Sequence, residues 1–353
     1  MTSSETQPLR IIALEEHCLS ASVDQSLYRN KTSFPPPVIE SLCDVGEGRI
    51  KSMDAGGIKL QVLSHTAGYA EDVLSYQAVN NDMAEAVAKN PTRFAAFAHL
   101  PMADPLKAAD ELRRCINELG FKGALVDNHA GGRYYEGPEY NSFWATLEEF
   151  DIPFYLRPTM LTSTMADWYQ GSYSPQASMG MSHFAFGWHF DTATHILRLY
   201  AAGVFDRFPK LKIILGHFGE SLPFFLEHIQ WFSANWGPIS RSFQQVYAEN
   251  FWFTTSSLKG VAPLACMLQN TKLGRIMFGI DYPFLKMQDG MAKSDVKART
   301  GPSSASPGPS DPDNSEWPDN FEGTERQKRS LKRIEAVIGQ KPWEWLAEFL
   351  PKQ

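Results

Sequence analysis

The stretch Ile11-Ile12-Ala13-Leu14-Glu15-Glu16-His17 has the pattern of an apolar β-strand that ends in an acid-x-His pair. On an extended backbone Glu15 and His17 point to the same side, because the side chains of a strand alternate between its two faces. A carboxylate and an imidazole that converge at the mouth of a buried strand can form half of a divalent-metal site. The alternative is that Glu15 and Glu16 only solvate the strand end. Other strands that end in His, Asp or Arg favour the metal-site interpretation.

Short apolar runs recur along the chain, and segments with helical periodicity separate them. The predicted strands cover residues 10–14, 60–64, 94–99, 123–126, 152–156, 212–215, 251–255 and 275–279. Most are largely apolar, as is typical of parallel strands buried on both faces. Helical periodicity is clear at 77–88, 106–119 and 192–200. Eight strands interleaved with helices predict an α/β fold, a (β/α)8 TIM-like barrel forming one domain over residues 1–353.

Two segments interrupt this pattern. Residues 161–190 are rich in Met, Ser, Gly and aromatic side chains, and we expect a long active-site loop there, after strand five. Residues 293–319 are poor in apolar side chains and full of Ser, Pro, Gly and Asp, which predicts a flexible insertion after strand eight. Two C-terminal helices are expected between residues 325 and 350, the second opening with a proline.

Composition narrows the class of protein. With 353 residues, 43% of them hydrophobic, the chain can bury a large core, and its net charge of -7 argues against a nucleic-acid surface. No apolar stretch is long enough to span a bilayer, and the first nine residues lack the apolar core of a secretion signal. The four cysteines are scattered, without a C-x-x-C pair, which suits reduced thiols. We therefore expect a cytoplasmic enzyme without membrane or nucleic-acid partners.

The ends of the predicted strands carry many groups suited to chemistry. In a (β/α)8 barrel the loops after the strands converge on one mouth, where active sites lie. The residues that follow the strands are Glu15 and His17, His65, His99, Asn128 and His129, Arg157, His217 with Glu220, Ser256 and Ser257, and Asp281. Each alone can be an ordinary buried polar residue, and for His65 and His99 that interpretation has equal weight. As a set they predict an active site.

Three motifs, in order along the chain, resemble a known family. Residues 13–17 (ALEEH), 215–223 (LGHFGESLP) and 278–284 (FGIDYPF) are similar to those of the amidohydrolase-related non-oxidative decarboxylases. That group includes γ-resorcylate, 2,3-dihydroxybenzoate and 5-carboxyvanillate decarboxylases and the aminocarboxymuconate semialdehyde enzyme. The resemblance covers roughly residues 11–284. It implies a single barrel, a small aromatic carboxylate as substrate, no organic cofactor, and a homodimer or homotetramer.

The resemblance also implies roles for individual residues. Glu15, His17 and Asp281 would hold a divalent ion (Zn, Mn or Mg), which would stabilise negative charge on the phenolic oxygen of a hydroxybenzoate. His217 and Glu220 would form a hydrogen-bonded pair near the substrate carboxylate. Asp281 is the candidate acid that protonates the ring carbon before CO2 departs. The substrate-binding residues expected around the ring are Arg157, His65, Asn128 and Phe284.

The chain departs from the family at strand five. The family places a histidine ligand just before a proline, whereas this chain has Arg157 before Pro158. A guanidinium has no lone pair to donate and would repel a cation. Either the metal survives on Glu15, His17 and Asp281, or Arg157 replaces it, paired with Glu15 or Asp281 and gripping the substrate anion. A further alternative is that His183 or His189 replaces the missing ligand.

Three functional hypotheses follow. The first is a carboxy-lyase acting on a hydroxylated aromatic acid. The second is a metal-independent lyase, isomerase or hydrolase of a phenolic or polyketide-like substrate that uses Arg157, His217 and Asp281. The third is a non-catalytic binding protein, which the acid–base set His217, Glu220 and Asp281 argues against, because a scaffold has no physical need for it. Metal analysis with and without chelation would separate the first two.

Overall fold

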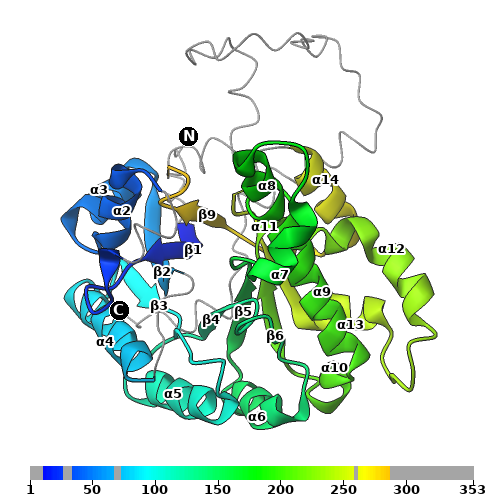
Figure 1. The fold of residues 1–353 in the computed structure, drawn as a ribbon. Coiled ribbons are helices and arrows are strands. Elements are labelled where there is room, and N and C mark those ends of the chain that lie inside the picture. Colours follow the sequence, from blue (N-terminus) through cyan, green and yellow to red (C-terminus); the bar gives the residue numbers. More distant parts are fainter. Residues whose placement is uncertain (1–10, 27–33, 67–72, 258–260, 287–353) are drawn as a thin grey trace, which may run out of the picture.

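The computed structural model describes residues 11–26, 34–66, 73–257 and 261–286. The insertion predicted at 293–319 and the helices predicted at 325–350 lie outside these ranges. Figure 1 shows the strands in the middle of the molecule and the longer helices around them. The strands are β1 (Ile11–Cys18), β2 (Ile58–His65), β3 (Phe94–Ala96), β4 (Ala124–Asp127), β5 (Pro153–Arg157), β6 (Lys212–Leu215), β7 (Phe251–Thr254), β8 (Ile276–Met277) and β9 (Gly279–Tyr282).

All strand pairs are parallel and form two sheets, ordered β3-β2-β1-β9 and β4-β5-β6-β7-β8. A bridge between Ala98 and Ala124 links the sheets beyond β3. At the other seam β8 and β9 are separated by Phe278, whose carbonyl accepts from the Leu14 amide at 3.0 Å. This arrangement is the predicted (β/α)8 barrel. The predicted eighth strand, 275–279, is instead two short strands, because the chain passes there from pairing with β7 to pairing with β1.

The helices connect successive strands. They are α2 (Pro36–Cys43), α3 (Glu47–Ala55), α4 (Val73–Lys89), α5 (Pro105–Asn117), α6 (Asn141–Glu149), α7 (Ser163–Ala166), α8 (Pro175–Ser182), α9 (Gly187–Ala201), α10 (Val204–Arg207), α11 (His217–Glu220), α12 (Leu222–Ser233), α13 (Phe243–Asn250) and α14 (Val261–Asn270), with 3-10 turns η1 (Pro138–Tyr140), η2 (Asp167–Tyr169) and η3 (Leu273–Arg275). Within the described ranges no helix combines the length and apolar character needed to cross a bilayer.

The segment after strand five is more ordered than the expected loop. Residues 161–190 contain α7, η2, α8 and the first turn of α9. Thr162 and Ser174 explain this, because their hydroxyls accept from the backbone amides of Met165 and Ala177 and so cap α7 and α8. Pro175 adds a residue suited to a first helical turn. Polar composition here marks helix starts rather than an irregular loop.

The core has two parts that follow from strand alternation. Inside the barrel lies a small apolar cluster: Ile12, Leu14, Leu60, Val62, Phe97, Leu125, Tyr155, Ile214 and Met277. A larger cluster packs between the strands and the helices and includes Ala13, Leu63, Phe154 and Leu215. Because the interior is filled with side chains, the polar groups at the strand ends are confined to the mouth of the barrel.

Glu16 is a structural residue and does not solvate the strand end. Its side chain is buried between three strands, with Oε2 accepting from Gln61 Nε2 at 2.8 Å and Oε1 accepting from the Ile280 amide at 3.1 Å. Burial raises the pKa of Glu16 well above its ordinary value, although the Ile280 hydrogen bond and Arg49 oppose the shift. Through these two hydrogen bonds Glu16 cross-links β1, β2 and β9.

Candidate functional site

A cavity of about 810 Å³ opens at the carboxyl ends of the strands. Six of the predicted site residues line it, namely Glu15, His17, Arg157, His217, Asp281 and Phe284. Glu220 lies behind His217, to which it is hydrogen-bonded. His65 and Asn128 are buried but are not part of the lining. Asn128 instead donates to Asp191 at 2.6 Å, and the ring of His65 lies 5.0 Å from that of His99, which does line the cavity.

The backbone turns the functional side chains into the cavity through left-handed conformations. Glu15 (φ 61°), His217 (φ 48°), Glu220 (φ 52°), Ser257 (φ 58°) and Asp281 (φ 70°) all have positive φ. At Glu15 this bulge shifts the β1–β2 register between Ala13 and Glu16. Simple strand alternation, which predicted that Glu15 and His17 share a face, is therefore not what brings them together.

Glu15 is held by three hydroxyl groups. Its Oε2 accepts from Tyr155, from Ser256 and, at 3.2 Å, from Thr254. Its other oxygen, Oε1, faces His217 Nε2 at 3.7 Å. Tyr155 and Thr254 were missed from the sequence, although a tyrosine inside the otherwise apolar strand five is a usable signal. The hydroxyl donors fix one oxygen of Glu15 and leave the other toward the cavity.

His17 and Asp281 form the next pair. His17 Nε2 lies 3.1 Å from Asp281 Oδ1, and the Ser257 hydroxyl donates to Asp281 Oδ2. Burial opposes ionisation of Asp281, but hydrogen bonds from His17 and Ser257 and the nearby His217 outweigh it and hold the pKa of Asp281 below its ordinary value. Asp281 is therefore a carboxylate at neutral pH and must gain a proton before it can donate one.

Glu15, His17 and Asp281 fit a divalent ion. One donor atom from each lies within 4.8 Å of the others, and all three side chains are buried. Two carboxylates and an imidazole suit Mn, Mg or Zn. Ser64 Oγ lies 3.2 Å from His17 Nδ1 and can accept its hydrogen. That tautomer leaves the Nε2 lone pair free for a metal, as ligating histidines require.

Arg157 favours the opposite tautomer. Its Nη1 also lies 3.2 Å from His17 Nδ1, and because a guanidinium can only donate, this contact requires the lone pair on Nδ1 and the hydrogen on Nε2. The Arg157 ion pair is with Asp127, whose Oδ1 accepts from both Nε and Nη2 at 3.2 Å. The predicted pairing of Arg157 with Glu15 or Asp281 was therefore wrong, since Asp127 at the end of β4 supplies the counter-charge. Asp127 was not predicted from the sequence, whereas the next residue, Asn128, was.

A second buried group surrounds Glu220. Its Oε1 lies 2.7 Å from His217 Nδ1 and its Oε2 lies 2.6 Å from His189 Nδ1. Burial opposes ionisation of Glu220, but the two imidazoles outweigh it and lower the pKa of its carboxyl group to about 2. Burial likewise opposes ionisation of His217, but Glu220 and Glu15 raise the pKa of its imidazole to about 10. The structure contains the predicted hydrogen bond between His217 and Glu220.

The two loop histidines have different positions. His189 belongs to the group around Glu220 and lines the cavity. His183 bonds to Ser182 and Met179 within its own segment and is not part of the cavity lining. Neither belongs to the candidate metal group of Glu15, His17 and Asp281.

Aromatic side chains form one wall of the cavity. The ring centroid of Phe34 lies 4.9 Å from that of Phe284 and 6.3 Å from that of Phe184, and the Phe184 centroid is 5.0 Å from that of Trp188. Phe284 in turn lies 5.8 Å from the His17 ring. The cavity thus has an apolar aromatic wall beside its charged groups, an arrangement suited to an aromatic ring with polar substituents.

The sequence family model described as amidohydrolase matches residues 41–311. The chain belongs to this amidohydrolase family. It is 44% identical over 296 residues to decarboxylase orsB of Emericella nidulans, with 81% of this chain and 88% of the relative covered. The crystal structure of 2,6-dihydroxybenzoate decarboxylase complexed with 2,6-dihydroxybenzoate has a TM-score of 0.72 and 34% identity, covering 81% of this chain and 92% of the other.

A second similar structure contains a metal. It is a dihydroxybenzoic acid decarboxylase from Polaromonas sp. with bound manganese and the inhibitor 2-nitroresorcinol, with a TM-score of 0.73 and 30% identity. The match covers 95% of this chain and 99% of that one. These matches agree with the family resemblance of the three sequence motifs.

Proposed function

We propose that this amidohydrolase-family chain is a carboxy-lyase that removes CO2, without oxidation, from a small hydroxylated aromatic acid. The observation that carries the proposal is one cavity in which the guanidinium of Arg157, the acid–base groups His217 and Asp281 and an aromatic wall face a common space. The names of the similar proteins, a decarboxylase and two dihydroxybenzoate decarboxylases, support the same reaction.

Arg157 is the proposed anchor for a substrate anion. Contacts with Asp127 and His17 use three of its five N–H groups, which leaves one on each terminal nitrogen. Such a pair of donors matches the two oxygens of a carboxylate or a carboxylate and its neighbouring phenol. The ionised His217 adds a second positive charge on the same cavity. Together they hold the substrate anion against the aromatic wall.

The chemical step needs a proton at the ring carbon and stabilisation of negative charge on the phenolic oxygen. Asp281 begins as a carboxylate, takes up one proton from solvent through the cavity and passes it to the ring carbon; the bond between the ring and the carboxylate then breaks, its electron pair restores aromaticity and CO2 leaves. A divalent ion on Glu15, His17 and Asp281 would, when bound, stabilise the phenolate. The contact between Arg157 and His17 favours a second form of the proposal, in which Arg157 supplies this charge and no metal takes part.

The test is CO2 release from a panel of mono- and dihydroxybenzoates carrying a 13C-labelled carboxyl group. We expect turnover with at least one dihydroxybenzoate and a loss of about 10²-fold or more in Asp281→Asn and His217→Asn. Lys89→Ala, at the exposed end of α4, is the control and should retain full activity. Absence of labelled CO2 across the panel, with the wild-type protein folded, would sink the decarboxylase proposal.

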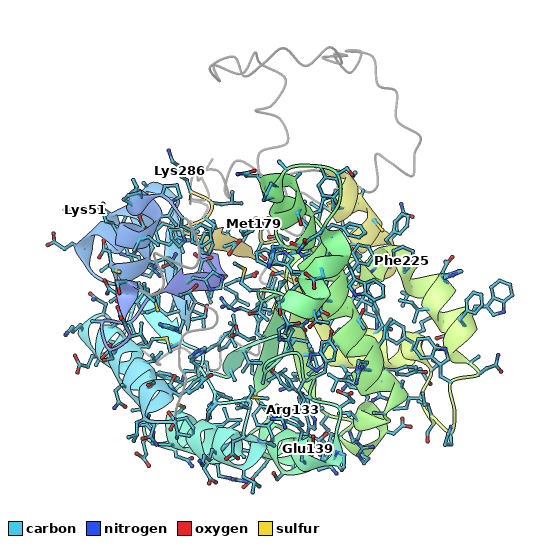
Figure 2. All side chains as sticks on the ribbon, in the orientation of Figure 1. Lys51, Arg133, Glu139, Met179, Phe225 and Lys286 are labelled. Atoms are coloured by element: carbon cyan, nitrogen blue, oxygen red, sulfur yellow. The ribbon has the colours of Figure 1, made fainter. Side chains whose placement is uncertain are left out.

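Self-association is proposed as well, and it rests on α12. Phe224, Trp231 and Phe232 on this helix are 74%, 75% and 55% exposed, and Phe225 at its start is labelled in Figure 2. Aromatic side chains so exposed on one helix favour a protein contact. Sedimentation of the wild type and of a Trp231→Lys variant tests this, and a monomeric wild type would rule it out.

A further inference from the structure

His189 lies in the first turn of α9, and its position there is tightly constrained. Gly187, which opens the helix, allows no side chain, because a Cβ atom would lie 2.2 Å from the Ser182 carbonyl oxygen. The close approach of these two backbones fixes the start of α9 against the end of α8. The next two residues, Trp188 and His189, both reach the cavity from this anchored turn.

The hydrogen bonds of His189 place a hydrogen on Nδ1. This nitrogen lies 2.6 Å from Glu220 Oε2, and a carboxylate can only accept. Nε2 has contacts of both kinds, because the Trp188 indole N–H donates to it at 3.0 Å and the Phe184 carbonyl, which can only accept, lies 3.3 Å away. The contact with Glu220 is the shortest of the three. In this arrangement His189 donates to a buried carboxylate.

Two roles are compatible with a cluster of His189, His217 and Glu220. The first is a second metal site, since one donor atom from each lies within 4.8 Å of the others. The hydrogen bonds argue against it, because Nδ1 donates to Glu220 and Nε2 already lies within hydrogen-bond distance of Trp188 and of the Phe184 carbonyl. A metal ion would have to displace one of these bonds. The second role is to orient Glu220.

We infer that His189 is a positioning residue that holds Glu220 so that its other oxygen serves His217. This inference rests on the proposed decarboxylase function, in which His217 faces the substrate anion. Each oxygen of Glu220 receives one imidazole N–H, at 2.7 Å from His217 and 2.6 Å from His189. Without the second donor the buried carboxylate can rotate, and His217 loses its fixed orientation. The series of hydrogen bonds Trp188–His189–Glu220–His217 thus links the orientation of His217 to the first turn of α9.

Kinetics of matched variants of the full-length protein test the positioning role. His189→Leu removes the donor, and we expect kcat for 2,6-dihydroxybenzoate to fall at least tenfold while KM changes less than threefold. His189→Asn places an amide N–H near the former Nδ1 position and should restore kcat to within threefold of the wild type. Lys89→Leu, at the exposed end of α4, is the control. Equal kcat losses in the Leu and Asn variants would overturn the inference.

Two readouts do not depend on turnover. With 15N-histidine labelling, the resonances that disappear in His189→Leu should show a ring with a hydrogen on Nδ1; a ring whose Nδ1 carries no hydrogen would refute the assignment. Bound Mn²⁺, measured after loading with the metal alone, should be the same in the wild type and in His189→Leu. Loss of one equivalent would make His189 a ligand and overturn the positioning role. If the wild type releases no CO2 from any hydroxybenzoate, the proposed function fails, and these two readouts still decide the role of His189.

Discussion

Replacing Arg157 by His is the change that bears most directly on the chemistry of the site. In the structure Arg157 Nη1 lies 3.2 Å from His17 Nδ1, a contact that requires the hydrogen of the imidazole on Nε2. A metal ion needs the lone pair on that same nitrogen. Metal binding therefore requires the Arg157–His17 bond to break and His17 to adopt the tautomer that donates to Ser64. Arg157→His removes the competing donor and adds a possible ligand.

The magnitude follows from the bond that must be lost. A hydrogen bond to a charged group contributes about 1.5 to 3 kcal/mol. Breaking this bond weakens metal binding to the wild type by the same free energy, which raises the Kd for the metal roughly 10- to 150-fold. Repulsion between the guanidinium and a divalent ion adds to the difference, because Arg157 is 5% exposed and poorly screened. We expect Arg157→His to bind Mn²⁺ at least about tenfold more tightly than the wild type.

The assay is titration of chelator-treated protein with Mn²⁺, followed by calorimetry or by the free-ion signal in electron paramagnetic resonance. Arg157→Gln removes the charge without adding a ligand and should fall between the wild type and Arg157→His. Arg157→Lys keeps a positive charge and is the control expected to bind weakly. The unfolding temperature of each variant shows whether loss of the ion pair between Arg157 and Asp127 disturbs the fold. Equal Kd values for the wild type and Arg157→His would refute the competition between Arg157 and metal.

Three further predictions concern stability. Glu16→Gln should lose less than about 1 kcal/mol of unfolding free energy, because Glu16 has a raised pKa and two hydrogen bonds that an amide can partly keep. Glu16→Ala should lose about 1 to 3 kcal/mol. Equal losses for the two variants in urea denaturation would contradict this. Burial and Arg157 lower the pKa of His99 from an ordinary 6.5 to about 3, so its contribution to stability is present above pH 6.5 and is lost as the pH falls toward 3. His99→Leu should then flatten the loss of stability between pH 6 and 4 by up to about 1.4 kcal/mol per pH unit, and an unchanged slope would count against a buried neutral His99. Gly187→Ala should cost about 1 to 3 kcal/mol in thermal unfolding, because the Ser182 backbone must move, and a neutral effect would contradict the anchored turn.

Much of the barrel could be predicted from the sequence because its strands are buried on both faces. Runs such as 212–215 and 152–156 stand out as short apolar segments between helical patterns, and they correspond to β6 and β5 within a residue or two. The eighth strand was harder. Phe278 is apolar like its neighbours, so no local signal shows that the chain changes partners there from β7 to β1. A change of pairing is a long-range property of the sheet.

Site residues with ionisable side chains at strand ends were predicted from the sequence. Residues whose role depends on the exact register of a strand were missed. His217, Asp281 and Arg157 are ionisable groups at strand ends and do line the cavity. Asp127 and Asn128 are adjacent, and consecutive side chains of a strand point to opposite sides. Asn128, the predicted residue, therefore hydrogen-bonds to Asp191 of α9, while Asp127 hydrogen-bonds to Arg157 at the site. A one-residue error in register is enough to exchange these roles.

The left-handed residues are a different kind of omission. Non-glycine residues rarely adopt positive φ, and the conformation costs of order 1 to 3 kcal/mol at each position. Glu15, His217, Glu220 and Asp281 share it, and each is held by hydrogen bonds to other site groups. Glu15 depends on three hydroxyls, and Glu220 depends on two imidazoles. The contacts that stabilise these backbone conformations are the contacts of the site itself. The backbone strain and the placement of the site side chains therefore depend on the same long-range contacts, which form only in the folded chain.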